Sequence, residues 1–332
     1  MDLDEQHWNG RNVLVTGGAG FIGSHLVERL LSYGAKVRVL ARYNSESSVG
    51  HLAPLVDVWE KQLDIRLGTV TDPSFVRHCV EGMDTVFHLA ALIGIPYSYV
   101  APGHYVDTNV SGTLNVLEAC RSEGVGRVVH TSTSECFGSA QYVPMDELHP
   151  IVTQSPYSAS KAAGDHLALS YHRSFDVPVV TLRPFNTFGP RQSQRAVIPT
   201  IIAQLLNGPR VEIGDLRPIR DLNPVSNTVD GFLLCGSSTG IEGDLFVIGT
   251  GEGHAVGDVL RTVATLLHIE PEIVQTAERI RPEASEVDRL VCNFERARKI
   301  LGYEPRMSFT DGLQASIAYM QQLPRTRLGY AI

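Results

Sequence analysis

Tyr157 and Lys161 are the residues of this sequence whose types and spacing most directly suggest chemistry. A separation of four residues places both side chains on one face of a helix. An ammonium beside a phenol stabilises the phenolate and lowers the phenol pKa, so Tyr157 could take a hydroxyl proton while hydride leaves the same carbon. Because such pairs also occur on ordinary helices, neighbouring motifs must decide whether this pair is catalytic.

A second group of polar side chains lies in the segment 130–138, at the end of a predicted strand. Ligands bind at the carboxyl ends of the strands in open α/β sheets. Ser132 or Thr133 could hydrogen-bond a substrate hydroxyl there, and Glu135 could remove a proton from carbon if its site is partly desolvated. The alternative for Glu135 is a solvated loop carboxylate.

A glycine-rich segment after the first predicted strand indicates a dinucleotide-binding loop. Its spacing permits a tight turn, close approach of backbone amides to a pyrophosphate, and close packing of helix on strand. The following helix adds partial positive charge at its amino terminus. Cofactor contacts are therefore expected from Gly17, Gly20, Phe21, Ile22 and Gly23.

The end of the second predicted strand bears on the choice of cofactor. A carboxylate there accepts a hydrogen bond from the ribose 2′-hydroxyl of NAD, whereas an arginine can accommodate the 2′-phosphate of NADP. This chain carries Arg42 and no carboxylate at that place. The sequence thus favours NADP, but stacking of Arg42 on the adenine would be compatible with NAD.

These motifs are separated by strands and helices that alternate along the first half of the chain, which is typical of a parallel sheet with helices on both faces. Strands are predicted over 12–16, 37–40, 63–67, 85–89, 127–132 and 179–183, and helices through Leu26, Leu30 and Leu31 and over 73–81, 104–122 and 157–174. The expected fold class is α/β: a Rossmann-type doubly wound parallel sheet with a smaller α/β substrate-binding lobe.

Prolines become frequent after residue 184, where helices are predicted over 196–207, 255–267 and 309–322. This change predicts a Rossmann domain over 1–184 and a substrate-binding lobe over 185–332. Parts of 228–250 are expected to return to the first domain.

Composition excludes several other classes of protein. Lys and Arg number 28 and Asp and Glu 36, a net charge of −8 with no basic run, which argues against nucleic-acid binding. No apolar run approaches the roughly 20 residues of a membrane helix. The cysteines are odd in number and never spaced as CxxC, which argues against disulfides and a structural metal and favours a cytoplasmic location. They are Cys79, Cys120, Cys136, Cys235 and Cys292.

Six segments carry a resemblance to a known family: 88–99 (HLAALIGIPYSY), 131–135 (TSTSE), 154–161 (QSPYSASK), 183–192 (RPFNTFGPRQ), 195–202 (RAVIPTII) and 279–287 (RIRPEASEV). Together with the glycine loop, they resemble the extended short-chain dehydrogenase/reductase superfamily over nearly the whole chain. Within it, the chain is most similar to the sugar-nucleotide 4,6-dehydratases of the legionaminic acid pathway.

The resemblance implies that a UDP- or GDP-linked hexose, expected to be NDP-N-acetylglucosamine, is oxidised at C4, dehydrated across C5–C6 and reduced at C6 by the same hydride. Tyr157 would take the C4 hydroxyl proton and Glu135 the C5 proton. NADP or NAD would be tightly held and recycled. The cofactor would also contact Leu89, Ala90 and Ala91.

The resemblance further implies a homodimer built on the helices over 104–122 and 157–174, and a site for the nucleotide diphosphate in the second lobe. Its expected residues are Asn186, Arg220 and Arg281, since arginine forks suit phosphate geometry. Arg191 is also expected to bind the substrate. A surface salt bridge is the alternative role for each arginine.

Some residues depart from the pattern of this family. Ser134 stands where dTDP-glucose dehydratases carry an aspartate, and Glu135 would then serve as both base and acid. Pro224 replaces an aromatic residue, Asn227 an aspartate and Thr69 the aspartate that contacts adenine.

Three other functions stay open. A C4 epimerase needs Tyr157 and Lys161 but no C5 base, and UDP-glucuronate decarboxylases share the Thr-Ser-Glu run. A redox-sensing dinucleotide-binding protein would need none of these catalytic groups.

Overall fold

The computed structural model describes residues 5–276 and 287–324. A seven-stranded sheet runs through it in the order β10-β6-β5-β4-β1-β2-β3, with every neighbouring pair parallel. The strands are β1 (Asn12–Thr16), β2 (Lys36–Arg42), β3 (Leu63–Gly68), β4 (Thr85–His88), β5 (Arg127–Thr131), β6 (Val179–Pro184) and β10 (Leu245–Ile248). The chain reverses its direction of winding between β1 and β4, the position at which doubly wound sheets bind ligands.

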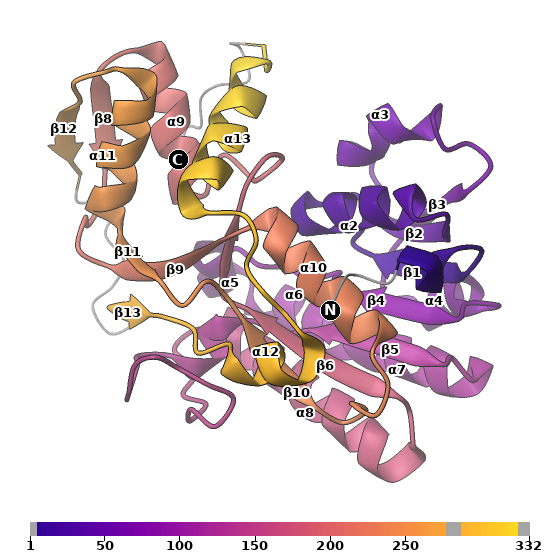
Figure 1. The fold of residues 1–332 in the computed structure, drawn as a ribbon. Coiled ribbons are helices and arrows are strands. Elements are labelled where there is room, and N and C mark those ends of the chain that lie inside the picture. Colours follow the sequence, from indigo (N-terminus) through magenta and orange to yellow (C-terminus); the bar gives the residue numbers. More distant parts are fainter. Residues whose placement is uncertain (1–4, 277–286, 325–332) are drawn as a thin grey trace.

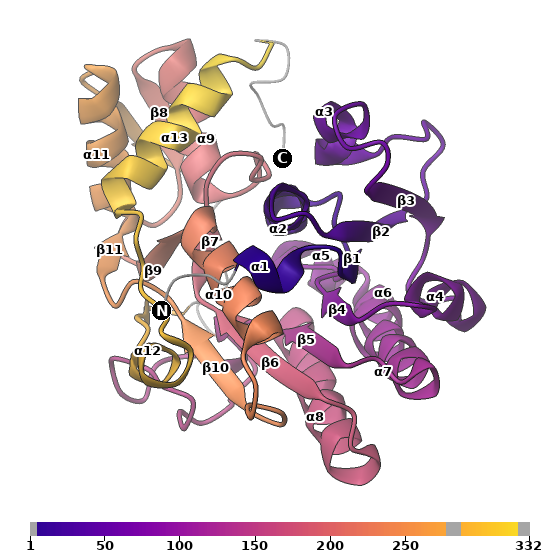
Figure 2. The ribbon, with the colours of Figure 1, turned by 45° about the vertical axis from the view of Figure 1, so that its right-hand side comes forward.

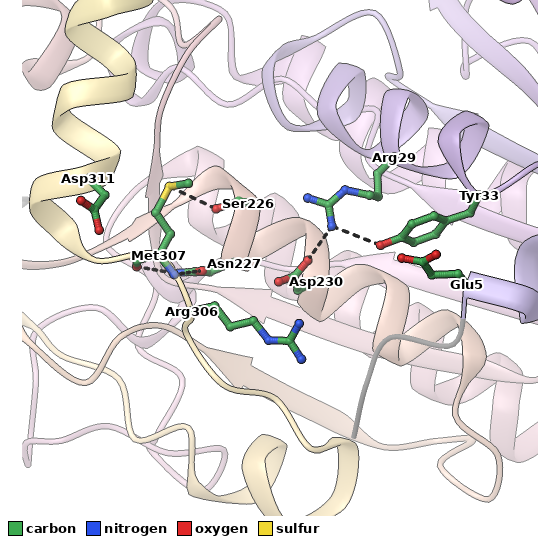
Figure 3. Close-up of a pocket in the computed structure, with 9 residues that line it drawn as sticks. All are labelled: Glu5, Arg29, Tyr33, Ser226, Asn227, Asp230, Arg306, Met307 and Asp311. Carbon is green, nitrogen blue, oxygen red and sulfur yellow. Dashed lines mark hydrogen bonds and ion pairs between the residues drawn. The ribbon is translucent and has the colours of Figure 1, made fainter.

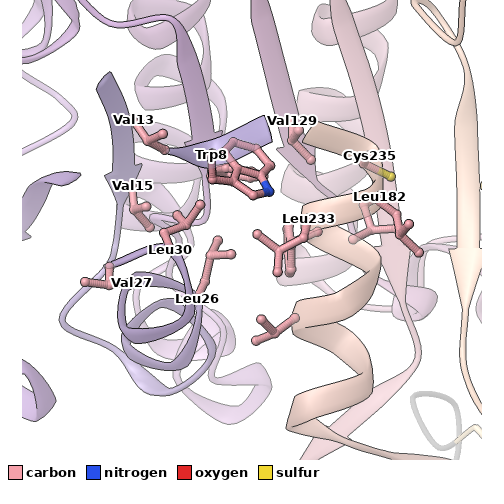
Figure 4. Packing of buried hydrophobic residues seen from close by; sticks show 14 of the residues in the cluster. Trp8, Val13, Val15, Leu26, Val27, Leu30, Val129, Leu182, Leu233 and Cys235 are labelled. Carbon is pink, nitrogen blue, oxygen red and sulfur yellow. The ribbon is translucent and has the colours of Figure 1, made fainter. Parts of the chain in front are cut away.

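Each face of the sheet is covered by helices, because alternate strand residues point to opposite sides. One face packs against α1 (Glu5–Trp8), α2 (Phe21–Ser32), α10 (Val225–Ser237) and α12 (Glu295–Leu301). Figure 4 shows part of this core, in which Trp8 lies between the strands and the α2 and α10 side chains. The other face packs against α4 (Pro73–Val80), α7 (Gly112–Glu123) and α8 (Pro156–Phe175).

A smaller lobe lies beside the sheet, at the upper left of Figure 1. Its core joins α9 (Val197–Asn207), α11 (Val256–Leu267) and α13 (Phe309–Gln321) with the paired strands β8 (Arg210–Ile213) and β12 (Glu272–Gln275). A second small sheet consists of β7 (Asn186–Phe188), β9 (Ile219–Pro224), β11 (Gly253–Ala255) and β13 (Arg289–Leu290).

Short elements complete the chain: η1 (Gly50–Leu52), α3 (Ala53–Val56), α5 (Ile95–Val100), α6 (Pro102–Tyr105), the π-helical turn η2 (Val106–Ser111) and the 3-10 turn η3 (Ser134–Phe137). Across the described residues, no helix is both long and apolar enough to span a membrane. Within the same ranges, no group of side chains is arranged to hold a metal ion.

The Rossmann-type class with a parallel sheet is confirmed. The helical stretch expected over 104–122 is helical from 102 to 123, with the six-residue π-helical turn η2 between α6 and α7. Between 228 and 250 the chain does contact the main sheet again. There α10 packs on one face, and β10 pairs with β6 at the edge, as Figure 2 shows.

Candidate active site

The glycine loop fits closely against the end of β4. Gly17 has a φ of +72°, and a Cβ added there would lie 2.9 Å from the Ala90 backbone nitrogen. A Cβ on Gly23 would lie 2.4 Å from the Gly17 carbonyl oxygen. Gly20 precedes α2 and no side chain caps that helix terminus. Backbone amides at the start of α2 are thus left for an anionic ligand, which suits a dinucleotide pyrophosphate.

The segment that follows β4 is held by two polar side chains. The Thr16 hydroxyl accepts from the Ala90 backbone N–H at 3.1 Å. Asn109, in the π-helical turn, accepts from the Leu92 N–H at 2.8 Å and donates to the Leu92 carbonyl at 3.0 Å and to the Ser160 hydroxyl at 2.9 Å. This brings the expected cofactor residues Leu89, Ala90 and Ala91 beside the glycine loop and α8. Sequence reasoning missed Asn109.

Arg42 lies at the end of β2 with an exposed side chain, in register with Gly68 of β3. The Asn44 amide donates to the Arg42 carbonyl at 3.3 Å. This arrangement leaves the Arg42 guanidinium accessible at the edge where a dinucleotide ribose is bound in this class of fold.

Helix α8 positions the Tyr157–Lys161 pair. Ser155 and Ser158 form a capping box at its amino terminus, and Pro156 occupies the first turn. Both catalytic candidates are buried. Burial raises the Tyr157 pKa, and a hydrogen bond with Thr133 opposes that rise. Burial lowers the Lys161 pKa, against the attraction of Asp165.

Glu135 lies in the same site as Tyr157. The turn η3 follows β5, and the Thr133 hydroxyl accepts from the Glu135 backbone N–H at 3.3 Å. The negative charge of Glu135 is near enough to contribute to the raised pKa of Tyr157. Ser134, which directly precedes Glu135 in the sequence, is buried with 2% of its surface exposed. The structure therefore combines a phenol, an ammonium and a carboxylate at the end of β5.

Ser132 does not fit the role expected of it. Its side chain is 3% exposed, donates to Asp165 Oδ2 at 2.5 Å and accepts from Arg183 Nε at 3.0 Å. Since its single donor is already engaged inside the protein, a hydrogen bond to a sugar hydroxyl from Ser132 is not supported. Of the two hydroxyls considered from the sequence, Thr133 is the one beside Tyr157.

The residues expected to bind the nucleotide diphosphate have different surroundings. Asn186 begins β7, and its buried Oδ1 has no hydrogen-bond partner in the described protein, as expected of a group awaiting a ligand. Arg220 lies on β9 and donates to the Ile219 carbonyl at 3.1 Å. Arg281 lies outside the described residues.

Arg191 is engaged with the first domain. Its Nη2 lies 2.7 Å from Glu28 Oε2 on α2, and its Nη1 lies 3.4 Å from Ser24 Oγ. The salt-bridge alternative therefore describes Arg191 better than substrate binding.

An open pocket of about 670 Å³ lies elsewhere, between α2, α10 and the segment before α13. Figure 3 shows the ion pair of Arg29 and Asp230 in its lining, with Arg306 and Asp311 on another chain segment. None of its lining residues belongs to the Tyr157 site. Volume alone thus does not locate the chemistry of this protein.

Comparison with known proteins assigns the family. Residues 14–316 match the family model described as GDP-mannose 4,6 dehydratase. A dTDP-glucose 4,6-dehydratase from Actinoplanes sp. is 34% identical over 313 residues, with 92% of this chain and 97% of the relative covered. A UDP-glucose 4-epimerase from Mycolicibacterium smegmatis is 31% identical over 315 residues, with 93% and 98% covered.

Solved structures agree with this assignment. DesIV, a dTDP-glucose 4,6-dehydratase from Streptomyces venezuelae solved with NAD bound, superposes with a TM-score of 0.84 at 30% identity, covering 94% of this chain and 97% of that chain. MoeE5 in complex with UDP-glucose and NAD gives a TM-score of 0.83 at 32% identity, with 94% and 99% covered. The chain belongs to the GDP-mannose 4,6-dehydratase family, within the extended short-chain dehydrogenases/reductases that the sequence motifs resemble.

Proposed function

We propose that this protein is an NDP-hexose 4,6-dehydratase that uses a tightly bound, recycled NAD or NADP. The observation that carries the proposal is the position of Glu135 beside Tyr157, which gives one site both a base for a hydroxyl and a base for a carbon acid. The named activities of the similar dTDP-glucose dehydratases support it. The UDP- or GDP-linked N-acetylglucosamine substrate is proposed from the six resembling segments.

The first step belongs to Tyr157. Because burial raises the Tyr157 pKa, its phenolate depends on the Lys161 ammonium on the same face of α8 and on the positive charge that an oxidised nicotinamide would add. The phenolate then accepts the proton of the C4 hydroxyl. The bound nicotinamide would accept the C4 hydride and later return it to C6. The glycine loop and residues 89–91 would hold that cofactor, since their close packing leaves backbone amides for its pyrophosphate.

The second step belongs to Glu135. Once C4 is a ketone the C5 proton is acidic, and the Glu135 carboxylate removes it. Ser134 is a poor acid. The protonated Glu135 therefore donates its proton to the departing C6 hydroxyl, which leaves as water. In the second lobe, Asn186 and Arg220 would hold the nucleotide diphosphate, and Arg281 is proposed to join them.

C4 epimerisation is the second candidate, because relatives of that name match nearly the whole chain and because it needs no acid at Ser134. A UDP-glucuronate decarboxylase is also open, and MoeE5 has been solved with UDP-glucuronic acid and NAD. Any catalytic turnover would exclude a redox-sensing binding protein. The proposal includes a cytoplasmic location, which suits five free, buried cysteines.

The test is a panel of sugar nucleotides incubated with the protein and followed by mass spectrometry for loss of water. Glu135→Gln should leave reduction of the bound cofactor nearly intact but suppress water loss by about a hundred- to ten-thousand-fold. Tyr157→Phe, the matched control, should prevent cofactor reduction. Wild-type product formed in deuterated water should carry deuterium at C5.

Dehydration by Glu135→Gln at the wild-type rate, or product without label at C5, would reject the dehydratase and favour epimerisation. Reduced nicotinamide that accumulates in proportion to product would contradict the recycling of the cofactor.

A further inference from the structure

A buried ionic network lies directly behind the Tyr157–Lys161 pair. The Asp165 carboxylate accepts hydrogen bonds from Ser132 Oγ at 2.5 Å, Arg183 Nη2 at 2.7 Å and His130 Nε2 at 3.0 Å. Arg183 Nε also donates to the Ser132 hydroxyl at 3.0 Å. Asp165 is 7% exposed and Arg183 1%. Buried charges of this kind persist only when paired and hydrogen-bonded, as they are here.

The network joins three elements at the active site. Asp165 lies on α8 one turn beyond Lys161 and two turns beyond Tyr157, so the three side chains share a helix face. Its partners come from the carboxyl ends of β5 and β6. Ser132 directly precedes Thr133, the residue that hydrogen-bonds Tyr157. The same contacts therefore fix both sides of the catalytic pair.

The charge of Asp165 also acts on Lys161. Burial lowers the Lys161 pKa, and the nearby Asp165 carboxylate is the main group that opposes this. The ionisable groups around Lys161 include Tyr157 on the same face of α8, His88 of β4, His130 of β5 and Cys136 of η3, and the Arg183 guanidinium is paired with Asp165. Burial keeps both histidines neutral by lowering their pKa, and burial raises the Cys136 pKa to about 12. Among the described residues, Asp165 is thus the carboxylate whose charge acts on Lys161, whereas the charge of Glu135 acts on Tyr157.

We propose that Asp165 is a positioning residue of the active site, which fixes the catalytic face of α8 and keeps the Lys161 ammonium charged. Its ties to Ser132 and Arg183 provide the fixed position, and its carboxylate provides the charge. The inference rests on the proposed role of Tyr157 and Lys161 in hydride transfer. It does not depend on whether dehydration or epimerisation follows.

The first test is Asp165→Asn, read by the pH dependence of cofactor reduction by substrate in a single turnover. Loss of the carboxylate lowers the Lys161 pKa, so the alkaline limb of the profile should move to lower pH by about one to three units. Asp230→Asn is the matched control, because it removes a largely buried carboxylate paired with Arg29 at 3.1 Å on a different helix. The alkaline limb of this control should stay in place.

Asp165→Asn leaves the Arg183 guanidinium buried without its partner and could fail to fold. The double variant Asp165→Asn/Arg183→Gln removes both charges but keeps hydrogen-bonding groups. Its alkaline limb should move in the same direction but less far, because losing the Arg183 charge offsets part of the loss of the Asp165 charge. In the cofactor-free protein, amide hydrogen exchange over 157–165 should be at least about tenfold faster in both variants than in the wild type.

A lower rate with an unmoved alkaline limb in both variants would overturn the electrostatic part of the proposal. Unchanged exchange over 157–165 would overturn the positioning part. A wild-type protein that reduces its cofactor without water loss would reject the dehydratase. The alkaline limb of cofactor reduction in the two variants would still decide this inference. If no sugar nucleotide reduces the cofactor, the exchange measurement still judges the positioning role.

Discussion

At the scale of single residues, Asn227 shows how a departure from a family pattern can be structural. Its buried side chain donates to the Met307 carbonyl at 2.9 Å and accepts from the Met307 N–H at 2.9 Å. An amide provides both a donor and an acceptor, whereas an ionised aspartate would only accept. Asn227 therefore connects α10 to the segment before α13. We attribute the asparagine at this position to that contact and not to the choice of substrate.

Arg42 gives the residue-scale prediction on cofactor choice. If its exposed guanidinium meets a 2′-phosphate, Arg42→Asp should replace an attraction by a repulsion and offer a carboxylate to a 2′-hydroxyl. The ratio of NADP to NAD affinity should then fall by at least about tenfold, measured by calorimetric titration of cofactor-stripped protein. An unchanged ratio would remove Arg42 from phosphate recognition and favour stacking on the adenine. Arg11→Asp, on the exposed approach to β1, is the control for net charge.

At the scale of elements, α7 and α8 carry the predicted dimer contact. The two helices pack side by side, and the apolar residues expected on them divide in the structure. Leu117 is buried in the core and Leu167 packs partly buried against it, whereas Leu114 is 38% exposed. Exposed apolar surface on paired helices is what a second copy of the chain would cover.

The wild-type protein should therefore be a dimer at micromolar concentration by light scattering. Leu114→Asp, which places a charge in the proposed contact, should weaken dimerisation at least about tenfold and release monomer. Leu148→Asp is the control, because Leu148 is exposed on the distant loop after β5. A wild-type monomer, or a Leu114→Asp protein that stays as dimeric as the control, would contradict the prediction.

The elements that sequence analysis predicted well are those with strong local patterns. Six of the seven main-sheet strands and the helices α4 and α8 follow from β-branched runs, apolar periodicity and caps, and their observed ends lie within two residues of those expected. Helix α2 contains the expected Leu26, Leu30 and Leu31, whereas β10 was not predicted as a strand. The π-helical turn could not be found this way. Asn109 in this turn forms hydrogen bonds with Leu92 and Ser160, which are distant in the sequence, so we attribute the turn to tertiary contacts. Local periodicity contains no record of such contacts.

At the scale of the whole molecule, the reactive groups of the site were predictable but their supports were not. Tyr157, Lys161 and Glu135 lie in motifs with a fixed spacing, and the structure brings them together. Asp165 and Arg183 come from a helix and a strand whose relative position no local pattern reveals. Arg191 was expected to bind the substrate but pairs with Glu28 on α2. This contact too joins distant segments, so no local pattern reveals it.

The Arg191–Glu28 ion pair and the His25–Pro190 hydrogen bond connect the loop at 190–191 to α2, and we call these contacts the clamp between the lobes. The His25 ring on α2 donates from Nε2 to the Pro190 carbonyl at 2.9 Å, and Arg191 beside it adopts a left-handed backbone with a φ of +68°. Non-glycine residues adopt this conformation at some cost, so the surrounding contacts must hold the loop in place. The hydrogen bond from His25 to Pro190 is one of those contacts. Because His25 is buried, the clamp is sensitive to acid.

Burial lowers the pKa of His25 to about 4, against an ordinary value of 6.5. The folded protein therefore keeps His25 neutral where the unfolded chain binds a proton, so its contribution to stability is complete above pH 6.5 and is lost as the pH falls from 6.5 to 4. The loss from this residue amounts to at most about 3 kcal/mol. His25→Gln retains an N–H donor for Pro190 but cannot titrate, so its free energy of unfolding in urea should fall less than that of the wild type between pH 7 and pH 4.5. Exposed His78→Gln should behave as the wild type does, and equal losses in all three proteins would show that His25 does not couple the clamp to pH.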